Sequence, residues 1–518
     1  KFDWMENHFT PEGEALTAFT PGALGANGLP LAIAYAQSPG AGKLDGANRP
    51  DAVNNFFTTP GYQRVYGHNL TSTLQASDSL TIKNIFGYRR SFIVSVSDLT
   101  GAGSLVTTPA VAAQLETNSR LPAGSLSSLI GSPYVAGGSA TLSKSKQFSD
   151  ELQLNYDSEL LTLTTGLMWF NVKTETGAPD GLLGPSTILS PVRGGVPGRN
   201  SRNLSFITME SFAGYAQAEF HVTPQLDIIG GYRLTHDIKN GVTWIRNTPY
   251  GFSYKDTRAS YMGTVNYRPN NDILVYGKYA TGYVSGGSVS GIDFKPEIAT
   301  SWEAGAKADL FNRMLRLNLA LFKTKYQDLQ AVSGGTFLVP PRPELGTLII
   351  NDGDLKTKGF EVEATLVPVR GVTLSASGGY TKAEASNSNA ALGLNRNLTL
   401  RPKWTSNVSA QYESDPLFGD TSFVIRADGA WRSKVRTVGQ NGLSADYNSI
   451  LYSPKGWVVN GRVGLQNVNL GGAKADITLW GRNIFDQDRP MFPIYFAFLG
   501  STSYERARTY GVDVAFKL

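Results

Sequence analysis

The stretch that decides the fold is the C-terminal segment 504–518, YERARTYGVDVAFKL. Its last five even-numbered positions carry apolar or aromatic side chains, while the positions between them are small, polar or charged; the even series is Tyr510, Val512, Val514, Phe516 and Leu518. Successive side chains of a β-strand point to opposite faces, so this strand has one apolar face. The same two-residue period runs through 161–169 and 315–321. Small and polar residues on the second face indicate a wet interior rather than a packed core.

This period predicts seventeen strands, near 61–75, 79–96, 145–156, 160–174, 204–221, 226–240, 256–267, 272–284, 297–309, 314–330, 354–366, 372–383, 401–413, 420–436, 456–469, 474–487 and 503–518. Eight connections are tight (76–78, 157–159, 222–225, 268–271, 310–313, 367–371, 414–419 and 470–473). Eight are long (97–144, 175–203, 241–255, 285–296, 331–353, 384–400, 437–455 and 488–502). Tight and long connections alternate without a break, as they do in outer-membrane barrels with short periplasmic turns and long extracellular loops. The sequence therefore predicts an all-β transmembrane antiparallel β-barrel, with the C-terminus in the periplasm.

Composition excludes several other classes of protein. Charged residues are 17% of the chain, against roughly 25% in soluble domains. No apolar run approaches the roughly 20 residues of a membrane-spanning helix. There is no cysteine, which excludes disulfide scaffolds and thiolate metal sites. A net charge of +5 without a basic block is typical of solvated surface, so we expect no nucleic-acid partner.

Enzyme chemistry has little support in the motifs. The four histidines lack metal-ligand spacing, and neither a G-x-S-x-G elbow nor a Walker A motif is present. We therefore predict no enzyme and no catalytic, cofactor-binding or metal-binding residue. A barrel phospholipase would need an outward Ser–His pair, for which the sequence leaves His68 and His236 open.

Three stretches carry motifs of a known family. They are NIFD at 483–486, the run from YGKYATGYVSGG at 276–287 through KPEIATSWEAGAKADLFNRMLRLNLALFKTKYQDLQ at 295–330, and YQRVYGHNLTSTLQASDSLTIKNIFGYRR at 62–90. Together they resemble the TonB-dependent outer-membrane receptor family. The NIFD stretch is interpreted as a packing and hydrogen-bonding element at a strand end rather than a ligand contact. The terminal Leu518 departs from the aromatic residue that usually ends family members.

The resemblance implies a 22-stranded barrel, so about five strands, the plug domain and the TonB-contacting segment are expected to be missing from this chain. The predicted domains are 61–518, the barrel, and 1–60, an extracellular loop region in which Phe2 and Trp4 hint at part of an upstream strand.

The implied function is uptake of a scarce nutrient (a siderophore, vitamin, saccharide or aromatic compound) across the bacterial outer membrane, with energy from the TonB complex. Expected partners include outer-membrane lipid and lipopolysaccharide, whose phosphates Arg506 and Arg508 could meet. Two alternatives stay open: a passive or degenerate channel, and a structural partner within a larger envelope assembly.

Ligand contacts are expected in the long loops, because loops on a rigid scaffold carry recognition. The candidates are Arg342, Tyr447, Phe492 and Tyr495. These loops are aromatic and weakly charged, which favours a sugar or neutral aromatic ligand over a strongly anionic chelate.

Overall fold

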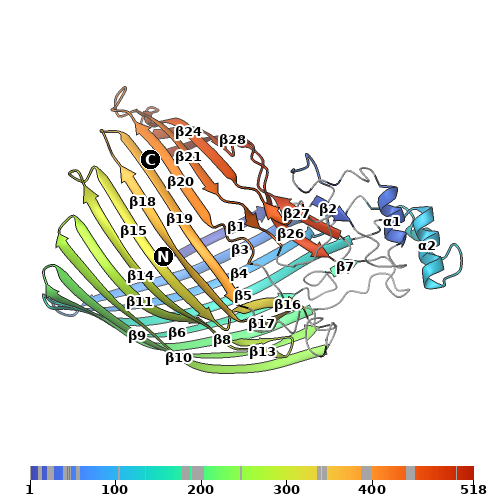
Figure 1. The fold of residues 1–518 in the computed structure, drawn as a ribbon, viewed down its shortest axis with the longest axis horizontal. Helices are drawn as coiled ribbons and strands as arrows, with labels where there is room; N and C mark the ends of the chain where they lie inside the picture. The colour runs from blue at the N-terminus through green and yellow to red at the C-terminus, as the bar shows by residue number, and fades with distance from the viewer. Residues whose placement is uncertain are drawn as a thin grey trace.

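The computed structural model describes residues 2–9, 15–19, 29–38, 44, 46, 48–53, 59–102, 105–132, 134, 136–177, 187–189, 203–245, 248–334, 340, 347–386, 398–438, 448, 450–496 and 499–517. Most of them belong to one antiparallel sheet of 19 strands, which curves into a barrel (Figure 1). None of the helices among these residues is long and apolar enough to cross a membrane.

Eighteen strands pair in chain order around the barrel. They are β1 (Phe2–Phe9), β3 (Thr59–Gln75), β4 (Leu80–Asp98), β5 (Ala136–Asp157), β6 (Leu161–Gly177), β8 (Asn203–Thr223), β9 (Leu226–Ile245), β10 (Thr248–Asn270), β11 (Ile273–Val284), β14 (Glu297–Leu310), β15 (Leu315–Gln327), β18 (Asp354–Leu366), β19 (Val372–Ser386), β20 (Trp404–Glu413), β21 (Ser422–Arg432), β24 (Gly456–Asn469), β25 (Lys474–Arg482) and β28 (Thr509–Lys517). The short strand β7 (Thr187–Leu189) pairs with the start of β5. All seventeen predicted strands are present. The expected total of 22 concerns residues beyond this chain and stays a prediction.

The two ends of the barrel differ, as the alternation of connections predicted. Eight tight connections meet at one end, here called the turn end, and the other end, the loop end, carries further structure (Figure 1). There lie the helices α1 (Leu29–Ala36) and α2 (Pro109–Ser119), a 3₁₀ turn (Ser127–Leu129), and four small sheets: β2 (Ala15–Phe19) with β27 (Leu499–Tyr504) and β26 (Pro490–Phe496), β12 (Gly287–Val289) with β13 (Ile292–Phe294), β16 (Gln330–Gly334) with β17 (Thr347–Asn351), and β22 (Val435–Arg436) with β23 (Tyr452–Ser453).

The prediction of a long loop at 241–255 was wrong. There β9 continues to Ile245 and β10 begins at Thr248, and the two strands pair residue by residue. The ring of Phe252 lies where a Cβ on Gly241 would be, so the aromatic side chain covers the glycine across the strand pair. Cross-strand packing of this kind stabilises a hairpin, and Gly241 leaves room for the ring.

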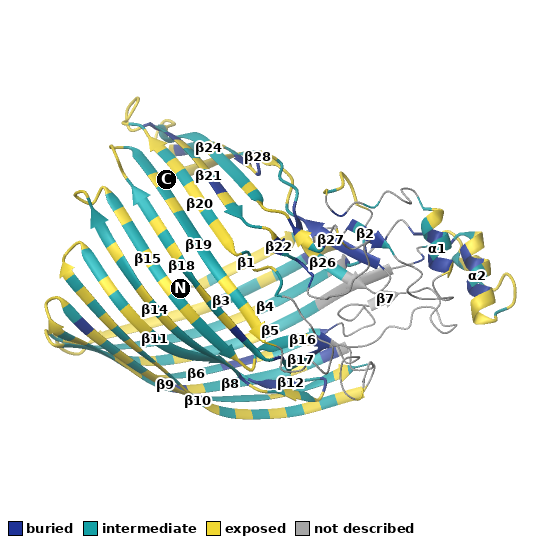
Figure 2. Cartoon of the chain, viewed as in Figure 1, coloured by how far each residue is buried: buried dark blue, intermediate teal, exposed yellow. Residues whose placement is uncertain are grey.

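The wall of the barrel has an apolar outer face and a polar inner face. On β10 exposure alternates along the whole strand, with Tyr261, Val265 and Tyr267 on the outer face. Inward positions between them include Arg258 and Arg268, which pair with acidic residues of the inner wall. The banding of exposed and half-buried residues across the strands is visible in Figure 2. The wall is thus built to meet lipid outside and water or polar groups inside.

The N-terminal region 1–60, expected to be loop with part of a strand, contributes both strand and helix. Its first residues form β1, paired with β3 from Phe2↔His68 to Phe9↔Gly61. Among the described residues β1 and β28 each have a paired neighbour on one side only, so they are the edges of the sheet. At the loop end β2 joins β27, which links the N-terminal region to the segment just before the last strand.

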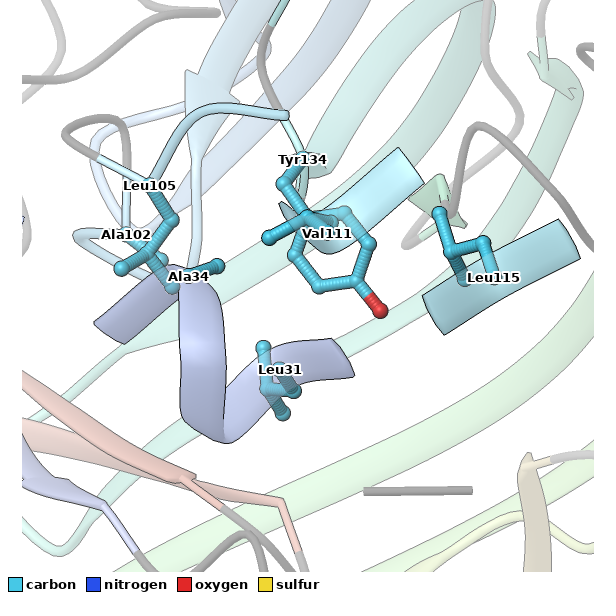
Figure 3. Packing of buried hydrophobic residues seen from close by; sticks show 7 residues of the cluster. All are labelled: Leu31, Ala34, Ala102, Leu105, Val111, Leu115 and Tyr134. Atoms are coloured by element: carbon cyan, nitrogen blue, oxygen red, sulfur yellow. The ribbon is translucent and has the colours of Figure 1, made fainter. Parts of the chain in front are cut away.

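A small hydrophobic core lies outside the barrel at the loop end. Helix α1 packs on α2 and the segment around it, and the buried members are Leu31, Ala34, Ala102, Leu105, Val111, Leu115 and Tyr134 (Figure 3). Thr108 caps α2, since its hydroxyl accepts a hydrogen bond from the amide of Val111 at 3.3 Å. Burial raises the pKa of Tyr134 to about 12. Residues 29–38, 98–102, 105–132 and 134 therefore form a packed cap.

The outward assignment of β15 can be tested by matched arginine substitutions. Leu319 lies on the outer face about midway along the strand, whereas its neighbour Ala320 faces inward, opposite Glu361. In lipid vesicles, Leu319→Arg is expected to lower the free energy of unfolding by about 2–4 kcal/mol, the cost of Arg at the bilayer midplane. Ala320→Arg is expected to stay within about 0.5 kcal/mol of the parent protein. Urea titration of the refolded barrel measures both, and equal losses would contradict the assignment.

Candidate functional site at the loop end

A polar and aromatic cluster lines the inner wall where the lumen opens at the loop end. We call it the mouth cluster; its members are Asp237 and Lys239 of β9, Tyr254, Asp256 and Arg258 of β10, and Tyr283 of β11. Arg258 Nε donates to Asp256 Oδ2 at 2.7 Å, and Tyr254 Oη donates to the same oxygen at 3.1 Å. Tyr283 Oη donates to Asp237 Oδ2 at 2.7 Å.

The local strand geometry brings Tyr283 into this cluster. Strand β11 follows β10 only as far as Ala280, after which the hydroxyl of Thr281 accepts a hydrogen bond from the amide of Tyr261 at 3.0 Å. A side chain thus replaces the regular backbone ladder, and β11 diverges from its neighbour. The divergence lets Tyr283 reach across β10 to Asp237 on β9.

Lys239 fastens the loop above the cluster to the wall. Its Nζ donates to the carbonyl oxygens of Gly286 at 2.7 Å and Ser285 at 3.4 Å, and it lies 5.8 Å from the ring centroid of Tyr254. Gly286 is needed at this contact, because a Cβ there would lie 2.6 Å from the carbonyl oxygen of Phe294 and 2.9 Å from Tyr254 Oη. The close approach orders the rim of the mouth.

One hairpin, β16–β17, is fixed to the same rim by two side-chain amides. Gln330 Nε2 donates to the carbonyls of Ser285 at 3.2 Å and Lys295 at 3.0 Å. Asn351 Nδ2 donates to Lys295 O at 3.0 Å. The hairpin, which begins with Gln330 and ends with Asn351, is therefore held against the segment above the mouth cluster.

The mouth cluster can bind a polar ligand without a strong preference for charge. Its two carboxylates balance one ammonium and one guanidinium group, and two phenol groups supply aromatic faces with hydroxyl tips. A charge-balanced set of this kind offers hydrogen bonds and stacking, whereas capture of a highly anionic chelate would favour unpaired arginines.

The four sequence-derived candidates are only partly visible. Phe492 lies on β26 with 59% of its surface exposed. The backbone of Tyr495 pairs with Gly500, but its side chain lies outside the described residues, as do Arg342 and Tyr447 altogether. Phe492 does not belong to the mouth cluster. Five of its six members lie in predicted strands, and only Tyr254 falls in the stretch that was assigned to a loop. The sequence analysis missed the cluster because strand register and the divergence of β11 bring these side chains together.

The NIFD stretch connects the segment after β25 to the segment before β28 through hydrogen bonds. Asn483 is buried; its Oδ1 accepts from the amide of Gln487 at 2.8 Å, and its Nδ2 donates to the carbonyl of Arg506 at 3.0 Å. Asn483 and Asp486 both have positive φ, 47° and 52°, a conformation in which Asn and Asp are enriched. The motif turns the chain after β25 and binds it to the entry of β28.

Asp486 extends this connection to the N-terminal region. Its Oδ1 accepts from the amide of Arg508 at 2.9 Å and from Arg49 at 2.7 Å. The hydrogen bond from the Arg508 amide, together with the Arg49 guanidinium, lowers the pKa of the Asp486 carboxyl. Arg49 also pairs with Asp488 at 2.8 Å. Arg508 is thus engaged in the protein through its backbone amide, and its proposed contact with lipopolysaccharide stays a prediction.

One group of potential metal ligands occurs among the described residues, formed by Glu219, His221 and Asp227. Both ring nitrogens of His221 already have partners, Asp227 Oδ1 at 2.8 Å and Thr162 Oγ1 at 3.2 Å. The second oxygen of Asp227 pairs with Arg268. We therefore interpret this group as an ion-pair network of the inner wall near the turn end.

Comparison with known proteins gives a consistent picture. The family model of the TonB dependent receptor-like β-barrel matches residues 9–484. The pesticin receptor of Yersinia pestis is 26% identical over 229 residues, which is 42% of this chain and 32% of the relative. The chain thus aligns with about a third of that curated relative.

Two solved structures share the fold. The ferric yersiniabactin uptake receptor FyuA of Yersinia pestis superposes with a TM-score of 0.65 at 16% identity, covering 88% of this chain and 62% of that one. The siderophore receptor PiuA of Acinetobacter baumannii also gives 0.65, at 15% identity, covering 99% and 71%.

The structural role of Asn483 predicts a stability effect. Asn483→Ala removes the partners of the Gln487 amide and the Arg506 carbonyl, and an unsatisfied buried group costs about 1–3 kcal/mol. We expect faster hydrogen exchange over 484–508 and a lower urea midpoint. The matched control is Asn407→Ala, which loses one exposed bond of 3.3 Å to Ser377. Unchanged exchange in the Asn483 variant would show that the motif does not hold this segment.

Proposed function

Because the chain belongs to the TonB dependent receptor-like β-barrel family, we propose that it is the barrel of a bacterial outer-membrane receptor that takes up a scarce nutrient, with siderophores as the first class to test. The matched relatives and structures are receptors rather than enzymes. The structural neighbour PiuA is a siderophore receptor, and this supports the substrate class proposed here.

In this proposal the loop end faces the outside of the cell and the turn end faces the periplasm. The cap and the mouth cluster then form the first surfaces that an arriving ligand meets. Transport through the lumen would draw energy from the TonB complex, as the family membership suggests. Lipid and lipopolysaccharide would surround the apolar outer face.

The observation that carries the proposal is the mouth cluster itself. It places ordered hydrogen-bond donors, acceptors and two phenol rings on the inner wall, at the entrance of the lumen. A barrel wall that served only as a scaffold would not need an ordered polar rim. Its balanced charge favours a neutral or weakly charged ligand that presents hydroxyl or amide groups.

The test of the function uses the gene in its own cell. Deletion is expected to reduce uptake of radiolabelled iron from at least one siderophore during iron-limited growth. A protonophore is expected to lower uptake by the parent strain to the level of the deletion strain. Uptake that survives the protonophore, together with open-pore conductance in a planar bilayer, would instead support a passive channel. Normal uptake of every nutrient class in the deletion strain would support a structural role in the envelope.

The mouth cluster predicts a specific loss of affinity. Lys239→Met removes the hydrogen bonds to Gly286 and Ser285 and loosens the rim. A charged hydrogen bond contributes about 1.5–3 kcal/mol, so we expect the apparent Kd for the transported ligand to rise about tenfold or more. Lys255→Met is the control, because Lys255 lies on the neighbouring strand with exposed side chain on the outer face. Equal affinities in the two variants would exclude the mouth cluster from binding.

The loop candidates make a second, independent prediction. Phe492 is an exposed aromatic ring at the loop end, and such rings contribute stacking area to sugar or aromatic ligands. Phe492→Ala is expected to weaken uptake severalfold at low ligand concentration, measured beside Leu470→Ala at the turn end, where Leu470 is similarly exposed. Unchanged uptake would remove Phe492 from the binding surface.

A further inference from the structure

The outer face of three neighbouring strands changes from apolar to basic at one height. Going from the turn end, the outward positions of β15 are apolar up to Leu321 and then become Lys323 and Lys325. On β18 the same change occurs between Phe360 and Lys358, and on β19 between Tyr380 and Lys382. Leu321, Phe360 and Tyr380 face one another across the strands, so the change falls in one line.

The first basic line consists of three directly opposed lysines, here called the lysine row: Lys323↔Lys358↔Lys382. Like charges placed directly opposite one another destabilise a sheet. Among the described residues, Lys382 is the one member of the row with a carboxylate partner, Glu384. Within the described part of the chain neither Lys323 nor Lys358 forms an ion pair, so the row presents uncompensated positive charge.

The next set of opposed outward positions, one step closer to the loop end, adds two more lysines. Lys325 and Lys356 are opposed, and Lys325 pairs with Asp354 at 3.3 Å. Counting both lines, five lysines face two carboxylates, Asp354 and Glu384. An anion bound between the opposed lysines would remove the repulsion that the sequence has built into this face.

Directly below the row lies an apolar groove of about 860 Å³. Lys323 and Lys358 stand among its lining residues, together with aromatic and small residues; these include Tyr279, Trp302, Phe360, Gly263 and Gly277. At Gly263 and Gly277 an added Cβ would meet no atom within 4 Å, so the glycines leave open space on the wall. The volume is that of a small-molecule site.

The height of the row matches the edge of the hydrocarbon layer. Lys323 stands nine residues beyond the end of the 311–314 turn; at about 3.3 Å per residue and about 45° of tilt this is roughly 21 Å along the membrane normal. The apolar band of an outer-membrane barrel is about 25 Å tall. The row therefore lies at the headgroup level of the leaflet on the loop side, with the groove among the acyl chains.

We propose that the lysine row and the groove below it form a binding site for a phosphorylated lipid of the outer leaflet, with phosphate on Lys323, Lys358 and Lys382 and an acyl chain in the groove. Lysine is a common phosphate binder, and clustered basic residues at a membrane surface bind anionic headgroups. The inference rests on the proposed outer-membrane location and is independent of the nutrient.

A second row of directly opposed basic residues lies on another part of the outer face. Arg90, Lys146 and Lys173 are directly opposed across β4, β5 and β6, and Arg90 lines a smaller groove of about 390 Å³ with Arg64, Tyr66 and Lys144. Here Lys144 is paired with Glu175 at 3.2 Å. The lysine row is the better candidate, since it combines more uncompensated charge with the larger apolar groove.

The test compares two triple variants of the full-length receptor purified from outer membranes. One replaces the row, Lys323→Gln, Lys358→Gln and Lys382→Gln. The control replaces three inward-facing basic residues outside the groove, Lys83→Gln, Lys307→Gln and Arg462→Gln, and so removes the same charge. Native mass spectrometry with added lipopolysaccharide measures binding. We expect the row variant to bind at least fivefold more weakly than the parent and the control, with arginine at the three row positions restoring binding.

The other outcomes would overturn the proposal in different ways. Equal binding by both triple variants would show that the lysines extend into the solvated interface without binding the phosphate. Equal binding of dephosphorylated lipid would exclude phosphate recognition, and competition by inorganic phosphate as effective as that by the lipid would exclude the groove. Nutrient uptake is measured separately: its loss in the deletion strain tests the proposed function, and lipid binding can fail while uptake persists.

Discussion

Backbone hydrogen bonding in a lipid environment is the constraint on which the rest of this structure depends. Hydrocarbon offers no partner to a free amide or carbonyl, so a polypeptide crosses it either as a helix or as strands that pair with their neighbours. This chain uses strands, and eighteen of them pair in sequence order with nearly unbroken register. Once pairing is fixed, the two-residue period assigns each side chain to lipid or to lumen, and the apolar and polar faces follow.

The same constraint explains why the two ends of the barrel are so different. At the turn end the chain only needs to reverse, and a few residues between paired strands do so. At the loop end the chain is free of the bilayer, and it builds helices, small sheets and a separate hydrophobic core. Long-range contacts hold this end together. Strand β2 joins β27, and Arg49 bridges Asp486 and Asp488, so residues near the start of the chain secure the segment that leads into its last strand.

The two faces of the wall carry separate chemistry. Inside, at the mouth, charges are paired and rings are held by hydrogen bonds, which produces an ordered surface suited to a polar ligand. Outside, at the same end, lysines are opposed to one another and only partly paired, above an apolar groove. Paired charges need no further counter-ion, whereas unpaired charges are stabilised by one. The inner set is complete in itself, whereas the outer set is stabilised by an anion that the protein does not supply.

The sequence alone determined the class of fold and the strands, because both follow from a two-residue period. It also determined which end of the barrel carries the tight turns and which the long connections, because the two kinds of connection alternate along the chain. It also identified the strand-end role of Asn483–Asp486. Local patterns could not show that 241–245 and 248–255 are paired strands, since that pairing places Phe252 against Gly241 across the strands. They could not assemble the mouth cluster or the lysine row either. Tyr283 meets Asp237 from 46 residues away, and Lys323, Lys358 and Lys382 become neighbours only through strand register. Register is a property of paired strands, and so the tertiary structure alone decided which side chains share a site.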